Sequence, residues 1–457
     1  MKLTRRQFVV GTAAGAVGAA GIYELVDQFS GGSPQRAAGA VKLPEQHLLE
    51  GVRVVRDDGV EVLVPPLHHQ ILTARVAVDR SELANARVEL ERELAGLDDD
   101  YAPSPAGLGV TVAWGRPYFD RFVPAAARRL LPLDRRAGKP VLIDAERFPS
   151  DPEDTRLEQN HVAFLLRSDA RDHIEDAAKR IRGTKLFDVT SVRRGFAGGG
   201  FDGEQSLPKQ MAEAAQIPGA DLIPETAELF LGFTSTQRAG MGPGGIANFE
   251  TLGYVDLRGS DYFRHGTHMH LSHIHEDVEA WYLNFDFDER VATAFRPNLD
   301  VKQGTQTVRQ GPQDVSSEAD VRRDFHSSGR IGHSAPIQTT SRLLADHVGE
   351  DGTVFVKGTA IPVRADFNTL DNPFAWSERS DEVGVLPAAG VHFVVFNPTG
   401  DDFRRNRLAM DGHLPGGTIP FPPRGREQGF NSVLSTTHRQ NFIVPPRRHR
   451  SFPLSEV

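Results

Sequence analysis

The residues with the clearest capacity for chemistry are histidines gathered near the middle of the chain. They are His265, His268, His270, His273 and His275, and acidic residues follow at positions 276, 277 and 279. On a strand, His268 and His270 would share one face, because side chains alternate with period two. A turn near Ser272 would bring His273 and His275 toward the same point. Imidazoles with a carboxylate suit Zn, Cu, Fe or Ni. The cluster is therefore a transition-metal site, a polar strand face, or the lining of a cofactor.

These histidines must be positioned by a fold in which strands and helices alternate. Apolar periodicity predicts strands over 70–78, 108–114, 161–166 and 186–192, and helices over 80–97 and 170–181. This order, β-α-β followed by β-α-β, is typical of a ferredoxin-like α+β unit. The second half repeats it less clearly, with strands over 265–273, 391–396 and 441–445 and helices over 276–285 and 401–410. Between them, the long Gly/Pro/Ser-rich stretch 300–390 is typical of a segment that builds a site.

The composition excludes several classes of chemistry. The 457 residues include no cysteine, which rules out disulfides, iron–sulfur clusters and thiolate nucleophiles or ligands. A net charge of −9 argues against nucleic acid as the main partner.

The N-terminus predicts export. Arg5 and Arg6 precede an apolar Ala/Gly-rich run over 10–22, as in a twin-arginine signal, which delivers folded proteins across a membrane. Ala38-Gly39-Ala40 offers a cleavage site, and a retained membrane anchor is the alternative. We therefore predict a signal peptide over 1–40 and a linker over 41–60. Two domains follow, over 61–240 and 241–457. The location would be extracellular, periplasmic or at the cell envelope.

Five segments, in order, resemble the dye-decolourising (DyP-type) haem peroxidases. They are His69-Gln70, "LGVTVAWGRPYF" over 108–119, Arg193-Arg194-Gly195-Phe196 followed by 231–236, 266–281, and 389–403. The resemblance implies an α+β fold with two ferredoxin-like halves, in the manner of a dimeric α/β-barrel. It also implies haem b held against the C-terminal half, with hydrogen peroxide and an organic reductant as substrates. The sequence leaves open whether the chain forms a homo-oligomer.

The resemblance also assigns site residues. His333 takes the place of the axial haem ligand, with His326 as the runner-up. Ser235 stands where the family has its proton-carrying Asp, and Val356 stands where it has its distal Arg. Lys357 and Arg364 are the nearby cations that could substitute.

The expectation is an exported haem-binding protein, either a divergent peroxidase or one with little turnover. A serine hydroxyl does not carry protons at neutral pH as a carboxylate does, and Lys does not reproduce the guanidinium geometry of Arg. The alternatives are a non-haem metal-binding protein that uses the histidine cluster, and a structural relative without catalysis.

Overall fold

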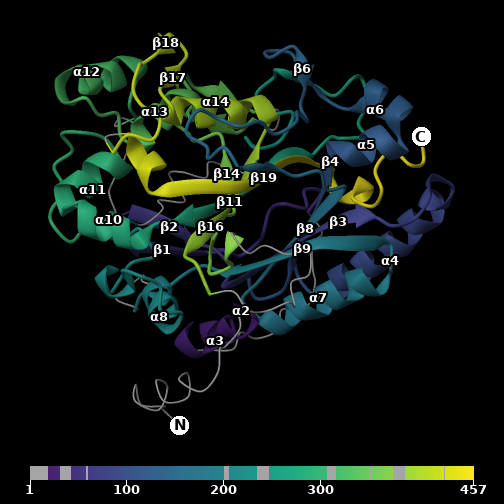
Figure 1. The fold of residues 1–457 in the computed structure, drawn as a ribbon. Coiled ribbons are helices and arrows are strands. Elements are labelled where there is room, and N and C mark those ends of the chain that lie inside the picture. Colours follow the sequence, from purple (N-terminus) through teal and green to yellow (C-terminus); the bar gives the residue numbers. More distant parts are fainter. Residues whose placement is uncertain are drawn as a thin grey trace.

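A barrel formed by one closed sheet lies at the centre of the protein (Figure 1). The computed structural model describes residues 19–30, 43–57, 60–199, 205–233, 246–305, 315–349, 352–373, 386–426 and 428–457. The barrel strands are β3 (His68–Val76), β4 (Gly109–Gly115), β8 (Val162–Ser168), β9 (Phe187–Phe196), β11 (Thr267–Glu276), β15 (Phe367–Thr369), β16 (Gly390–Asn397) and β19 (Leu434–Val444). Around the barrel they follow the order β11-β16-β15-β9-β3-β8-β4-β19, and the ring closes because β11 also pairs with β19.

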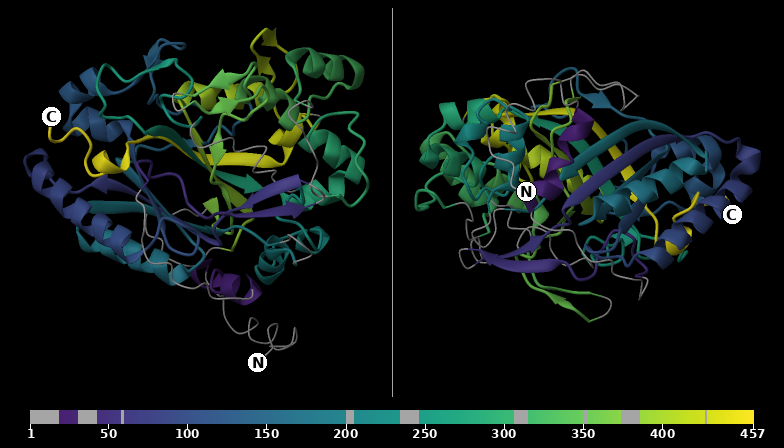
Figure 2. Two further views of the ribbon diagram at one scale, coloured as in Figure 1. Left: turned by 180° about the vertical axis from the view of Figure 1, so that it is seen from behind. Right: turned by 90° about the horizontal axis from the view of Figure 1, so that it is seen from below.

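The N-terminal half is the four-strand run β9-β3-β8-β4. Helices α4 (Leu83–Asp100) and α7 (Arg171–Gly183) follow β3 and β8 and lie together along one side of the barrel (Figure 2). Helix α4 buries Leu83, Ala86, Leu90, Leu94 and Leu97, whose spacing of three or four residues places them on one face. This strand order, with two crossover helices on one face, is that of a ferredoxin-like unit.

The C-terminal half repeats the scheme with the run β19-β11-β16-β15. Helix α10 (Val278–Asn284) follows β11, and α14 (Gly400–Met410) follows β16. The expected α+β fold with two ferredoxin-like halves is confirmed. The predicted strands and helices lie within a few residues of those observed, except that β19 begins seven residues before the predicted strand 441–445.

The two halves meet at two seams in the barrel. At the first seam, β15 pairs with β9 only where Asn368 lies opposite Phe196. At the second seam, β19 pairs with β4 through Phe442 opposite Gly115 and Ile443 opposite Trp114. Apolar residues from both halves, including Ile71, fill the barrel interior.

Parts of the chain predicted to be removable or passive are packed into the fold. Helices α2 (Ala19–Ile22) and α3 (Leu25–Ser30) lie within the predicted signal peptide 1–40 and contribute buried side chains. The predicted linker 41–60 is also structured. Its buried Gln46 donates from Nε2 to the carbonyls of Val112 and Pro445, and its end forms a hairpin of β1 (Arg53–Asp57) with β2 (Val60–Val64). The linker prediction is therefore wrong.

The long stretch 300–390 supplies structural elements as well as connections. It contains α12 (Glu318–Ser328), α13 (Ser334–Ser341), β14 (Val363–Arg364) and the barrel strand β15. Composition hid these elements because they are short and separated by Gly- and Pro-containing turns.

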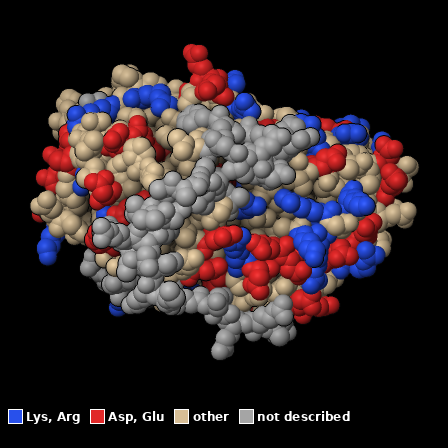
Figure 3. Space-filling model, turned by 60° about the horizontal axis from the view of Figure 1, so that its bottom comes forward, with Lys and Arg blue, Asp and Glu red and all other residues tan. Residues whose placement is uncertain are grey.

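The remaining helices and strands are short. They are α5 (Arg116–Phe122), α6 (Pro124–Leu130), β5 (Leu133–Asp134), β6 (Lys139–Pro140), β7 (Arg156–Leu157), α8 (Leu207–Ala214), β10 (Val255–Asp256), α11 (Phe287–Ala294), β12 (His347–Val348), β13 (Val354–Phe355), β17 (His413–Leu414) and β18 (Gly417–Thr418). Single 3-10 turns cover Arg80–Glu82, Ala220–Leu222, Gly429–Ser432 and Arg447–His449. Within the described ranges, no helix has both the length and the apolar character needed to cross a membrane. On the face shown in Figure 3, acidic and basic side chains are interspersed.

Candidate functional site

His333 lies at a corner of the C-terminal half, as the N-cap residue of α13. Gly332 precedes it with φ +71°, and a Cβ there would come within 2.4 Å of the Phe295 carbonyl oxygen, so only glycine suits this corner. Pro336 falls in the first turn of α13, where a missing N–H is tolerated, and the helix therefore continues past it. The imidazole packs against Phe430, with ring centroids 4.6 Å apart.

The electrostatic surroundings keep His333 neutral. Burial, and then the positive charges of Arg364 and Arg407, together lower the pKa of His333 to about 3. A neutral imidazole carries the free lone pair that a metal ion binds.

Arg364 projects from β14 toward the helices that cover the outside of the C-terminal half. It lies opposite Val395 in the β14–β16 register, and Val395 packs against Phe403 of α14. Its guanidinium forms a two-pronged ion pair with Asp366, through Nε–Oδ1 at 3.0 Å and Nη2–Oδ2 at 3.1 Å. Arg364 therefore lies near His333, and the carboxylate of Asp366 already balances most of the positive charge of Arg364.

Glu276, at the end of β11, adds a protonated acid to this region. Burial, and then the charge of Asp366, raise its pKa from 4.5 to about 8. Its buried Oε2 has no hydrogen-bond partner in the described part of the chain. From the sequence, Glu276 could be named only as one of the acidic residues that follow the histidines. Its raised pKa results from burial, which the sequence does not show.

The other residues assigned through the resemblance lie elsewhere or outside the described residues. Lys357 is exposed, and its backbone N–H donates to Asp346 at 2.7 Å. Val356 is 51% exposed, so neither residue points into a covered site. His326 is exposed on the last turn of α12, which disfavours it as an axial ligand. Ser235 falls outside the described residues.

The histidine cluster does not converge as the metal hypothesis requires. His268 and His270 face α14, where the His270 ring stacks on Phe403 with centroids 3.5 Å apart. His273 has the opposite parity and shares the barrel interior with Leu271. The strand continues to Glu276 without turning near Ser272, so the imidazoles remain on opposite faces of the sheet.

The other two histidines of the cluster are also separate. His275 is half-buried at the end of β11, beyond a register shift. His265 precedes the strand with φ +67° and pairs with Glu45 at 3.0 Å. Among the described residues, no group of three or more His, Cys, Asp or Glu side chains is arranged to hold a metal ion. The predicted four-histidine metal site is therefore wrong.

A line of buried rings crosses the barrel interior instead. His273 contacts His392 at 4.3 Å between centroids, and His392 lies 5.3 Å from Phe367, which stacks on His69 at 4.6 Å. Burial is the largest cause lowering the pKa of His273, His392 and His69. The sequence shows that side chains alternate between the two faces of each of these strands. Which face lies in the interior can be told only once the strands are known to form a barrel.

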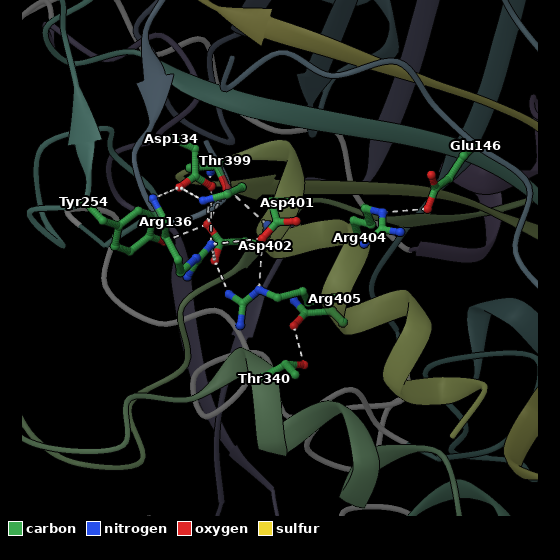
Figure 4. Close-up of polar contacts among 12 residues, drawn as sticks. Asp134, Arg136, Glu146, Tyr254, Thr340, Thr399, Asp401, Asp402, Arg404 and Arg405 are labelled. Atoms are coloured by element: carbon green, nitrogen blue, oxygen red, sulfur yellow. Dashed lines mark hydrogen bonds and ion pairs between the residues drawn. The ribbon is translucent and has the colours of Figure 1, made fainter. Parts of the chain in front are cut away.

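A second polar cluster joins the halves at the start of α14 (Figure 4). The buried carboxylate of Asp402 accepts from Arg136 Nη2 at 2.8 Å, from Arg405 Nη2 at 2.8 Å and from the Tyr254 hydroxyl at 2.7 Å. Asp402 also caps α14 by a reciprocal pairing with Thr399. Arg136 and Arg405 are both ion-paired with carboxylates of this cluster, so we interpret it as a clamp between the segment containing β5 and the C-terminal half.

The residues around His333 fit the haem that the resemblance implies. Haem iron binds a neutral imidazole nitrogen, and the low pKa of His333 provides one. Haem propionates are anionic, and Arg364 and Arg407 lie close enough to that imidazole to lower its pKa, although Arg364 is paired with Asp366 and Arg407 with Asp411. The neutral imidazole of His333 is therefore a donor that haem iron can bind.

The chain belongs to a family described as a family of unknown function (DUF7405), which matches residues 66–446. A search among curated proteins found no match.

Solved DyP-type peroxidases are similar to the chain over most of its length. A Shewanella oneidensis protein assigned to the DyP-type peroxidases is 13% identical, with 91% of this chain and 98% of that chain covered and a TM-score of 0.49. A Rhodococcus jostii DypB variant in complex with haem is 14% identical, with 85% and 96% covered and a TM-score of 0.48. A dye-decolorizing peroxidase from Bacteroides thetaiotaomicron is 11% identical, with 85% and 98% covered and a TM-score of 0.47.

Proposed function

We propose that this chain is an exported haem-binding relative of the DyP-type peroxidases, with His333 as the axial ligand. The observation that carries the proposal is the neutral imidazole of His333 beside the guanidinium groups of Arg364 and Arg407. The sequence resemblance supplies the identity of the cofactor. Export belongs to the same proposal and is supported by Arg5 and Arg6 before the apolar run.

The expected activity is weak peroxide-dependent oxidation of an organic reductant. Bound haem would supply the redox chemistry, and the protein would have to move a proton and stabilise developing negative charge. Asp366 already neutralises Arg364 through two contacts, which reduces the positive charge available for that stabilisation. Glu276 holds a proton near neutral pH and is the carboxylic acid in this region suited to exchange one.

Titration of the purified protein with haemin tests the proposal. We expect a saturable Soret band that His333→Ala removes or shifts, with affinity lowered at least about tenfold. The control is His326→Ala, which removes an exposed imidazole from the surface of α12 and should leave the titration unchanged. An unchanged Soret band in His333→Ala would refute the axial assignment. Loss of the band in His326→Ala instead would move the ligand to that residue.

A further inference from the structure

Residues 19–30 lie against the first seam of the barrel. In Figure 1, α2 and α3 lie at the lower edge of the molecule, near α8 and the N-terminal half. Ile22, Tyr23 and Val26 are buried in an apolar cluster with Phe196 of β9 and Leu370. Phe196 and Leu370 come from opposite sides of the seam, so the segment covers the junction between the halves.

The hydroxyl of Tyr23 is bound into the seam. It donates to Asp371 Oδ1 at 2.9 Å, lies 3.0 Å from the Thr369 hydroxyl, and accepts from the Leu370 N–H at 2.9 Å. Asp371 in turn accepts from the backbone N–H of Arg194 on β9 at 2.8 Å. A single strand pairing joins β9 to β15 here, so these bonds supply much of the polar contact across the seam.

Two further contacts anchor the segment. Asp27 Oδ1 lies 2.7 Å from His68 Nε2, at the start of β3. Asp371 also lies 3.2 Å from Nε2 of His392, which connects the segment to the line of rings inside the barrel. Removing residues 19–30 would expose this apolar cluster to water and take away the hydrogen bond that Tyr23 donates to Asp371. Both changes would lower the stability of the fold.

We propose that residues 19–30 stay attached to the exported protein as a structural part of the barrel seam, and that cleavage at Ala38–Ala40 does not release them. The part of this inference that concerns the exported protein rests on the proposed function, because it assumes export. The docking itself does not depend on export. The apolar run that begins at residue 10 then remains joined to the folded protein.

Peptide and intact-mass analysis of the protein recovered outside the cytoplasm tests retention. We expect every recovered chain to include residues 19–30, and a mature N-terminus beyond residue 30 would overturn the proposal. Failure of the export proposal gives a different result, because no chain would then be recovered outside the cytoplasm, or the Arg5→Lys/Arg6→Lys variant would be exported as well as wild type. The docking would then be decided by hydrogen exchange alone.

Hydrogen exchange on the full-length chain tests the docking. We expect Tyr23→Phe to speed exchange of the Leu370 N–H by about tenfold to a hundredfold, since the ring remains while its hydroxyl bonds are lost. Gln28→Ala is the matched control, because Gln28 is exposed on the same segment. If Tyr23→Phe fails to fold, Asp27→Asn should speed exchange of the segment by removing the His68 contact. Exchange equal to wild type in Tyr23→Phe, or in Asp27→Asn where Tyr23→Phe does not fold, would overturn the docking.

Discussion

Replacement of Asp402 by Asn tests whether the cluster at the start of α14 clamps the two halves together. The change keeps the size of the side chain and removes its charge. It weakens the hydrogen bonds from Arg136 and Arg405, which both donate to the carboxylate (Figure 4). One carboxylate oxygen becomes an amide NH2 group, which cannot accept a hydrogen bond.

The expected cost follows from burial. Asp402 has a side chain only 2% exposed, whereas Arg136 and Arg405 are 33% and 31% exposed. A hydrogen bond to a charged group contributes about 1.5–3 kcal/mol, and solvent screening of the two arginines reduces this. We expect Asp402→Asn to lower the free energy of unfolding by about 2–4 kcal/mol. At ~2.1 cal/mol/K of unfolding entropy per residue, the Tm of this chain should fall by about 2–4 °C.

Thermal unfolding followed by circular dichroism measures this change, and the same helix offers a control. Arg404 pairs with Glu146 at 2.7 Å, but the two side chains are 35% and 44% exposed. Arg404→Ala should therefore cost no more than about 0.5 kcal/mol. The double variant Asp402→Asn/Arg136→Gln should lose less than the two single variants together, since both remove one contact. A Tm for Asp402→Asn equal to that of wild type or of Arg404→Ala would refute the clamp.

Three further outcomes are expected. The raised pKa of Glu276 means that the folded chain keeps a proton that the unfolded chain releases above its ordinary pKa, 4.5, so stability should fall as pH rises from about 5 to about 8. In urea titrations Glu276→Gln should gain stability over wild type across that window, and a constant difference would contradict this. Gly429 has φ +55°, and a Cβ there would lie 3.2 Å from the Cα of His333, so Gly429→Ala should lower the Tm and weaken haemin binding together; unchanged binding would separate this turn from the site. Arg5→Lys/Arg6→Lys should hold the precursor in the cytoplasm, as cell fractionation would detect; persistent export would exclude the twin-arginine route.

The sequence predicted the ferredoxin-like halves because their signals are local. Helix α4 carries its apolar residues at helical spacing, and its neighbouring strands carry β-rich runs. The signal was weakest at β15, whose three residues lie within a Gly- and Pro-rich stretch. Its place as a barrel strand depends on pairing with β16 and β9, which come from distant parts of the sequence.

The candidate site was only partly predictable for the same reason. His333 and Arg364 could be named from the resemblance, and Lys357 could be set aside only after its exposure was known. The histidine cluster was misread because spacing gives the face of each side chain only if the strand continues, and β11 runs on to Glu276. Burial decides which carboxylates stay protonated, and no local pattern reports burial of Glu276.

The seams also govern how the chain reaches its final state. Closing the barrel brings Asn368 beside Phe196 and Phe442 beside Gly115, pairs that are far apart in the sequence. Such non-local contacts form slowly, because loop closure costs entropy before the contacts form. Until β19 pairs with β4, the edge of β4 offers unpaired backbone groups on which other chains can aggregate. A chain that closes the barrel before export would not expose the edge of β4 after it has crossed the membrane.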